Sequence, residues 1–110
     1  MSEYLLHAAV AEYLRYACKR TWWHSHQSGN LSMTERMKAK RMGRRAGVPD
    51  FTFIGPDGRT AFIELKADGG RQTEPQAVFE ESARKDGALY AVCRSLPEVE
   101  GTLKGWGVLA

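Results

Sequence analysis

One stretch of the sequence decides the fold: GVPDFTFIGPDGRTAFIELK, residues 47–66. It holds two runs rich in aromatic and β-branched residues, 50–54 and 60–66, which are typical of β-strands. The turn sequence GPDG separates them at residues 55–58, and such a turn between two apolar runs indicates a β-hairpin. We therefore predict that this stretch forms two antiparallel strands joined by a tight turn.

Three charged residues interrupt this apolar hairpin. Asp50 stands at its entry, and Glu64 and Lys66 lie in the second strand. Side chains alternate across a strand, so Glu64 and Lys66 share one face. Burying a carboxylate and an ammonium is costly unless the two are paired or coordinated. Two interpretations stay open here: a metal-binding catalytic cluster, or a structural Glu64–Lys66 pair on an exposed face.

The length of the turn decides whether Asp50 joins that face. A two- or four-residue loop would pair Asp50 with Ile63 and leave the two acids on opposite faces. A three-residue loop over residues 56–58 pairs Asp50 with Glu64. The sequence Pro-Asp-Gly fits a type I turn followed by Gly58 in the left-handed conformation. We therefore predict the three-residue loop, which brings both carboxylates and Lys66 together.

Two carboxylates this close repel each other unless a cation lies between them, and their hard oxygen ligands select Mg²⁺ or Mn²⁺. Such an ion polarises a phosphodiester and activates a bound water. A neighbouring ammonium orients that water or neutralises charge in the transition state. The pattern therefore favours metal-dependent hydrolysis of a phosphodiester.

The remaining sequence predicts helices that alternate with strands. Leu6, Val10 and Leu14 recur at helical spacing, and Ser32 and Gly43 are placed to cap and to end a second helix. TEPQ and SLPE have capping-box spacing and start two later helices. This order indicates a mixed sheet flanked by helices. The expected helices cover residues 2–20 and 33–42 and begin at 73 and 95, and the further strands cover 21–26 and 89–93.

Composition indicates one globular domain over residues 1–110, with 43% hydrophobic and 26% charged residues. No window approaches the roughly 18 consecutive apolar residues of a membrane span. Glu3 stands where a secretory signal would carry positive charge. Cys18 and Cys93 are too few for a disulfide framework, so we expect a reduced pair and a cytoplasmic protein.

Basic residues are concentrated in one segment. The formal net charge is only +3, yet the stretch 36–45 holds six basic residues and no acid, which leaves the rest of the chain net acidic. A nucleic-acid backbone is the partner that such a patch would attract; a solvated basic helix without a ligand is the alternative. The six residues are Arg36, Lys38, Lys40, Arg41, Arg44 and Arg45.

Three sequence pieces occur together: GVPD at 47–50, FIELKA at 62–67, and Gln76 at the opening of a helix. Their joint spacing resembles the VRR-NUC family, a branch of the PD-(D/E)XK nuclease superfamily, and the similarity extends over most of the chain. The resemblance implies a restriction-endonuclease-like α/β fold, with a mixed central sheet flanked by helices in a single domain.

The same resemblance implies roles for individual residues. Asp50, Glu64 and the main-chain carbonyl of Leu65 would bind Mg²⁺ or Mn²⁺, and Lys66 would serve the attacking water. Gln76 matches a glutamine that the family places near the active centre.

The family also places a glutamate on its first helix, and two residues are candidates. Glu3 lies on the apolar stripe of that helix, whereas Glu12 points to the opposite side. Because only an inward-facing acid can reach the hairpin, we choose Glu3, which would support a second metal ion or its water. His7, one turn further on, stands where relatives often carry Gln.

The implied activity is that of a metal-dependent endodeoxyribonuclease. Stand-alone members of this size resemble phage and bacterial enzymes, which form homodimers and are associated with branched DNA, four-way (Holliday) junctions especially. Two alternatives are retained: a non-catalytic DNA-binding subunit, and a monomeric flap or single-strand nuclease.

Overall fold

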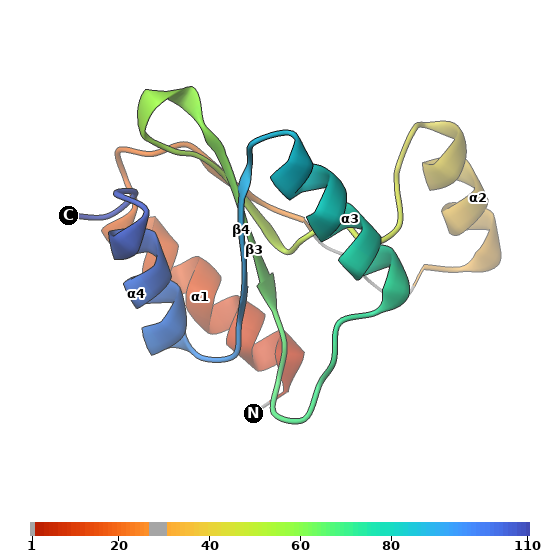
Figure 1. The fold of residues 1–110 in the computed structure, drawn as a ribbon. Coiled ribbons are helices and arrows are strands. Elements are labelled where there is room, and N and C mark those ends of the chain that lie inside the picture. The colour runs from red at the N-terminus through yellow and green to blue at the C-terminus, as the bar shows by residue number, and fades with distance from the viewer. Residues whose placement is uncertain (1, 27–30) are drawn as a thin grey trace.

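The computed structural model describes residues 2–26 and 31–110 (Figure 1). Within these residues, four strands form one sheet in the order β1-β2-β3-β4. The first three strands are antiparallel, and β3 and β4 are parallel, so the predicted mixed sheet is confirmed. The elements are α1 (Glu3–Ala17), β1 (Trp23–Ser25), α2 (Met33–Arg41), β2 (Phe51–Ile54), η1 (Pro56–Gly58), β3 (Thr60–Leu65), α3 (Glu74–Lys85), β4 (Leu89–Cys93) and α4 (Leu96–Gly105).

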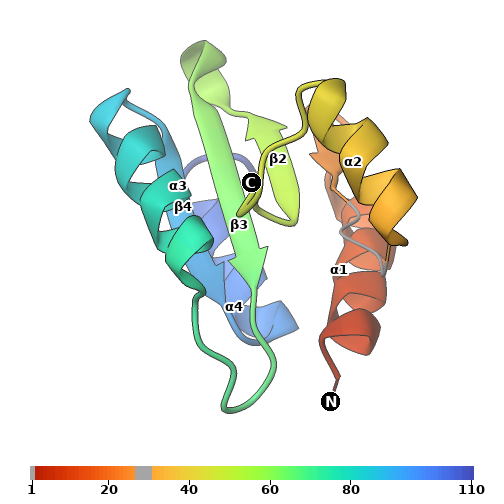
Figure 2. The same ribbon diagram turned by 90° about the vertical axis from the view of Figure 1, so that its right-hand side faces the viewer.

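The sheet lies between two helical layers. Helices α1 and α4 lie side by side on one face, and α3 covers the other (Figures 1 and 2). The main core fills the space between the sheet and the α1–α4 pair, because the apolar stripe of α1 meets the inward side chains of the strands. It includes Leu6, Val10, Leu14, Phe51, Phe53, Ile63, Leu65, Cys93, Val99 and Leu103.

The α3 face has a smaller apolar contact. Phe62 of β3 meets Phe79 of α3 edge to face, with ring centroids 5.2 Å apart, and Tyr90 of β4 completes the group. The predicted capping box starts this helix: the Thr73 side chain accepts from the Gln76 backbone, and the Gln76 side chain accepts from the Thr73 backbone. Every residue of α3 keeps some exposure to solvent. Polar contacts at its ends therefore matter for its position.

The hairpin has the predicted register. Phe51 lies opposite Ile63 in β2 and β3, and one further step along this register sets Asp50 opposite Glu64. The loop between the strands has three residues, closed by a hydrogen bond from the Gly55 amide to the carbonyl of residue 59 at 2.7 Å. This turn places the two carboxyl-bearing positions at the same height in the sheet.

Three details of the prediction are wrong. The turn is not a type I turn followed by one left-handed glycine, because Asp57 also has a positive φ of 63°, next to Gly58 at 75°. Aspartate is among the few non-glycine residues that tolerate this region. The first helix and first strand are shorter than expected, since Cys18 leaves the helical conformation and only Trp23–Ser25 pair with β2.

Gly47 brings the start of the hairpin against α3. Its φ is +80°, and a Cβ atom there would lie 2.4 Å from the carbonyl oxygen of Pro75. We expect Gly47→Ala to lower the free energy of unfolding by about 2–4 kcal/mol, because backbone strain adds to a steric clash. Urea denaturation measures this loss.

Gly87 provides the matched control. It has a similar φ of +90°, but a Cβ there would meet nothing within 4 Å. Gly87→Ala should therefore lose only the backbone contribution, about 1 kcal/mol. Equal losses for the two variants would show that the close approach of Gly47 to α3 contributes nothing.

Candidate active site

Three elements meet at one end of the sheet: the carboxyl end of β3, the amino end of α1 and the entry to β2 (Figure 2). Lys66, directly after β3, lies among their polar side chains and is 7% exposed. Its Nζ is 3.9 Å from Glu64 Oε2 and 3.9 Å from Glu3 Oε1. Glu12 is exposed on α1. The geometry therefore agrees with the choice of Glu3 over Glu12, while the role of Glu3 stays a prediction.

Glu64 has the most constrained carboxylate of the site. Its side chain is completely buried, and its Oε1 accepts a hydrogen bond from the Tyr90 hydroxyl at 2.5 Å. Oε2 is the only buried side-chain oxygen or nitrogen in the described part of the chain that lacks a hydrogen-bond partner. The interpretation of Glu64 and Lys66 as a solvent-exposed surface pair is therefore wrong.

Asp50 lies against the backbone of β3. Its Oδ2 accepts a hydrogen bond from the amide of Leu65 at 2.7 Å. Burial raises the pKa of Asp50, while the Leu65 amide and nearby His7 act in the opposite direction. The carboxylate is thus held beside the residue that separates Glu64 from Lys66, and a bound cation would stabilise its charged form.

His7 and Ser25 form a contact that the sequence did not reveal. His7 Nε2 is 2.6 Å from Ser25 Oγ, and its Nδ1 is 3.5 Å from Asp50 Oδ1. The ring also packs against Phe51, with centroids 4.6 Å apart. The sequence marks His7 only as a departure from the family pattern, because nothing in it indicates that β1 brings Ser25 next to α1.

Tyr90 is a second residue that sequence analysis missed. It lies in an apolar strand, and only its hydroxyl distinguishes it from its core neighbours. Burial, followed by the hydrogen bond to Glu64, raises the pKa of Tyr90. The hydroxyl therefore keeps its proton at neutral pH and donates a hydrogen bond to the Glu64 carboxylate.

The residues present fit a hard divalent cation. Asp50 and Glu64 supply carboxylate oxygens, the ligand type that Mg²⁺ and Mn²⁺ prefer, and Oε2 of Glu64 is free to bind one. In residues 2–26 and 31–110, no group of three or more His, Cys, Asp or Glu side chains is arranged to hold a metal ion. Protein sites for Mg²⁺ often use only one or two carboxylates, and water and substrate phosphate complete the coordination.

Gln76 has a structural task in this fold. Its side-chain Oε1 accepts a hydrogen bond from the Thr73 backbone amide at 2.8 Å, and the Gln76 backbone amide donates to Thr73 Oγ1 at 3.3 Å. These contacts cap α3. Gln76 also lines the groove described next, and its expected place near the active centre stays a prediction.

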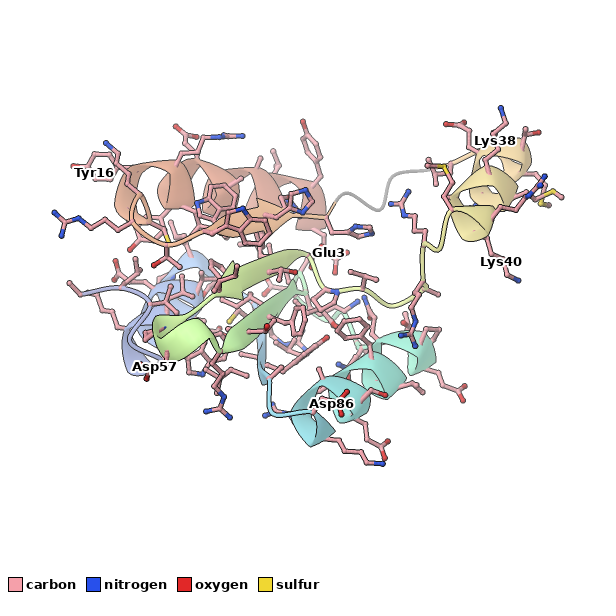
Figure 3. The ribbon with its side chains drawn as sticks, turned by 90° about the horizontal axis from the view of Figure 1, so that it is seen from above. Glu3, Tyr16, Lys38, Lys40, Asp57 and Asp86 are labelled. Atoms are coloured by element: carbon pink, nitrogen blue, oxygen red, sulfur yellow. The ribbon has the colours of Figure 1, made fainter. Side chains whose placement is uncertain are left out.

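A groove of about 1130 Å³ lies between α2 and the amino end of α3. Arg36, Lys40, Arg44 and Arg45 line it, together with residues 73–76 of the opposite wall. Four of the six basic residues singled out from the sequence thus share one concave surface, which we call the basic groove. Figure 3 shows α2 standing apart from the sheet, with Lys38 and Lys40 on its surface.

His26 links the wall of the basic groove to the backbone at the entry of β2. Its backbone amide donates to the carbonyl of Asp50 at 2.7 Å, and its Nε2 lies 3.3 Å from Arg44 Nη2. Burial, followed by the charge of Arg44, lowers the pKa of His26, so the neutral ring accepts a hydrogen bond from the guanidinium. His26, a residue of the groove wall, is therefore held both by Arg44 and by the backbone of Asp50.

The described residues include no helix long and apolar enough to cross a membrane.

Comparison with known proteins identifies the family. A family model described as the VRR-NUC domain matches residues 6–97. A solved structure described as a VRR_NUC domain protein has a TM-score of 0.77 and 22% identity, over 100% of this chain and 91% of its own. A second solved structure, described as a VRR_NUC domain, has a TM-score of 0.65 and 22% sequence identity. The match covers 96% of this chain and 98% of the other. A search of the curated proteins finds no match. Because the family model covers most of the sequence, the chain belongs to the VRR-NUC family of nuclease domains.

Proposed function

We propose that the protein is a Mg²⁺- or Mn²⁺-dependent endonuclease that hydrolyses phosphodiester bonds in branched DNA and acts as a homodimer. The observation that carries the proposal is the buried Glu64 Oε2, which lacks a hydrogen-bond partner and lies 3.9 Å from Lys66 Nζ. A buried carboxylate oxygen without a donor is costly. A bound cation would turn that cost into a ligand interaction.

Asp50, Glu64 and the Leu65 carbonyl would hold the ion. When bound, the divalent ion supplies a Lewis acid that polarises the phosphodiester. Lys66 orients the attacking water through its ammonium, and Glu3, 3.9 Å away, keeps that ammonium in place. The water oxygen attacks phosphorus in line, the bond from phosphorus to the 3′ oxygen breaks, and that oxygen takes up a proton. The products are a 5′-phosphate and a 3′-hydroxyl.

The basic groove would bind the phosphate backbone. Arg36 and Lys40 lie one helical turn apart on α2 and both line the groove. In the double variant Arg36→Ala/Lys40→Ala, we expect weaker binding to DNA and a smaller salt dependence, by about one unit of log–log slope for each phosphate that the protein no longer neutralises. Fluorescence anisotropy without divalent metal, over a series of KCl concentrations, measures both quantities.

Lys19→Ala/Lys104→Ala is the control for this measurement, because these lysines belong to the α1 and α4 side of the molecule. The control should bind DNA with the wild-type salt dependence. If both double variants lose the same affinity and slope, binding follows total charge and the basic groove has no special part.

A dimer suits a branched substrate because the resolution of a four-way junction needs two symmetric cuts. The experiment that tests the proposed function is a panel of labelled junction, flap, nicked and linear DNA, incubated with Mn²⁺ or with EDTA. We expect cleavage that depends on Mn²⁺ and is fastest on the junction. The protein should sediment as a dimer.

Each part of the proposal can fail separately in this panel. Binding without cleavage on every substrate would make the protein a DNA-binding subunit. Equal cleavage of junction and linear duplex would remove the preference for branched DNA. A monomer that cuts flaps or single strands would support the second alternative, a monomeric flap or single-strand nuclease.

A further inference from the structure

We propose that Tyr90 is a positioning residue of the active site, which fixes the Glu64 carboxylate so that Oε2 stays available to a divalent ion. The proposal rests on the proposed function, because it assigns a device that prepares Glu64 for metal binding. Tyr90 itself touches neither substrate nor ion in this arrangement; it acts through Glu64.

The strand register brings the two side chains together. Tyr90 of β4 lies opposite Phe62 of β3. Phe62 is two residues before Glu64, so the three side chains lie on the same face of the sheet. The Tyr90 hydroxyl reaches Glu64 Oε1 at 2.5 Å. Tyr90 is 3% exposed and Glu64 is 0% exposed, so water does not compete for this hydrogen bond.

A chain of hydrogen bonds on α3 supports the backbone of Tyr90. Gln72 donates from Nε2 to Glu80 Oε1 at 2.9 Å. The other oxygen of Glu80 accepts from Arg84 Nε at 2.8 Å, and Arg84 Nη2 donates to the backbone carbonyl of Tyr90 at 2.8 Å. Through Arg84, the last turn of α3 is tied to the residue that supports Glu64.

The ring of Tyr90 is also fixed by its neighbours. Its centroid lies 6.2 Å from that of Phe62 and 6.4 Å from that of Phe79. The guanidinium of Arg84 lies 6.0 Å from the ring centroid. These neighbours leave the Tyr90 side chain little freedom to rotate. Its hydroxyl can therefore fix the position of the Glu64 carboxylate, which accepts its hydrogen bond.

The consequence concerns the choice between two partners of Glu64. The last torsion of a glutamate side chain is broad, so a carboxylate without a fixed donor can rotate and offer both oxygens to Lys66. With Oε1 engaged by Tyr90, the Lys66 ammonium stays 3.9 Å from Oε2. Tyr90 therefore fixes Oε2, beside the ammonium, as the oxygen that remains for a divalent ion.

The test is Mn²⁺ binding to Tyr90→Phe in the absence of DNA, measured by electron paramagnetic resonance. The substitution keeps the ring and removes only the donor. We expect Mn²⁺ affinity to fall about tenfold, the lower end of the effect of groups that orient metal ligands. At saturating Mn²⁺ the cleavage rate should recover toward the wild-type value, and the KM for DNA should not change.

Tyr13→Phe is the matched control. The Tyr13 hydroxyl also donates to a carboxylate, Glu100 Oε2, at 2.7 Å, but it joins α1 to α4 on the other face of the sheet. The variant removes a hydrogen bond of the same kind there, so a general decrease in stability appears in both variants. Weaker Mn²⁺ binding should appear only in Tyr90→Phe.

The outcomes separate this inference from the proposed function. Wild-type Mn²⁺ affinity in folded Tyr90→Phe overturns the role of Tyr90 and leaves the nuclease proposal standing. A wild-type protein that neither binds Mn²⁺ nor cuts DNA overturns both. Should Tyr90→Phe fail to fold, Arg84→Ala replaces it, because Arg84 contacts both the backbone carbonyl and the ring of Tyr90: we expect a smaller loss of Mn²⁺ affinity, and unchanged affinity would contradict the inference.

Discussion

Replacing Lys66 with alanine is expected to lower the rate of DNA cleavage by about 10²- to 10⁴-fold, the range for a group that orients or deprotonates a nucleophile. The ammonium lies between Glu64 and Glu3 at 3.9 Å from each, and no other lysine is buried in the described residues. No second buried ammonium in these residues is therefore available to replace it. Binding to DNA should persist, because the basic groove is untouched.

Single-turnover cleavage in Mn²⁺ with labelled junction DNA measures the rate, and anisotropy measures the binding. Lys104→Ala is the control: its ammonium also lies near a carboxylate, Glu100, at 3.8 Å, but on the surface of α4. It should cut at the wild-type rate. A Lys66→Ala variant that binds and cuts DNA like the wild type would show that the ammonium has no part in the reaction.

Replacing Glu64 with glutamine should reduce cleavage by about 10³-fold, because the amide removes the charge that would hold the cation. The two side chains have nearly the same shape, so the fold should persist without metal. The wild type should be stabilised by Mn²⁺, by about 2.7 kcal/mol at a hundredfold excess over Kd. Glu64→Gln should gain nothing from the ion.

Thermal unfolding with and without Mn²⁺, followed by circular dichroism, gives this difference without any DNA. Glu12→Gln is the control, since Glu12 is exposed on α1 and was rejected as a site residue. It should keep both the stabilisation and the activity. If Mn²⁺ stabilises Glu64→Gln as much as the wild type, the ion binds elsewhere and the ligand assignment is wrong.

Short-range chemistry made much of this fold predictable. The Pro-Asp-Gly loop fixed the register of β2 and β3, and Thr73 and Ser95 marked the starts of α3 and α4, because a turn and a cap depend on a few adjacent residues. The same register led to the pairing of the Asp50 and Glu64 positions. The resemblance to VRR-NUC sequences then supplied the fold class, which the family comparison confirms.

Contacts between distant segments were not predictable. Tyr90 reaches Glu64 through a parallel pairing whose register is set by the whole crossover through α3, and no local pattern encodes it. The contact of His7 with Ser25 depends in the same way on how β1 lies beside α1. The left-handed Asp57 was missed because proline before it is compatible with more than one turn type.

Helix α2 has no buried residue, and its methionines Met33 and Met37 are 74% and 62% exposed. Substitutions on it therefore cost the core almost nothing, whereas changes around Glu64 and Lys66 disturb a packed interior. Substitutions that alter the charge of this arm should therefore leave the packing around Glu64 and Lys66 intact. Under the proposed function, such substitutions would change how DNA is held without changing the residues assigned to hydrolysis.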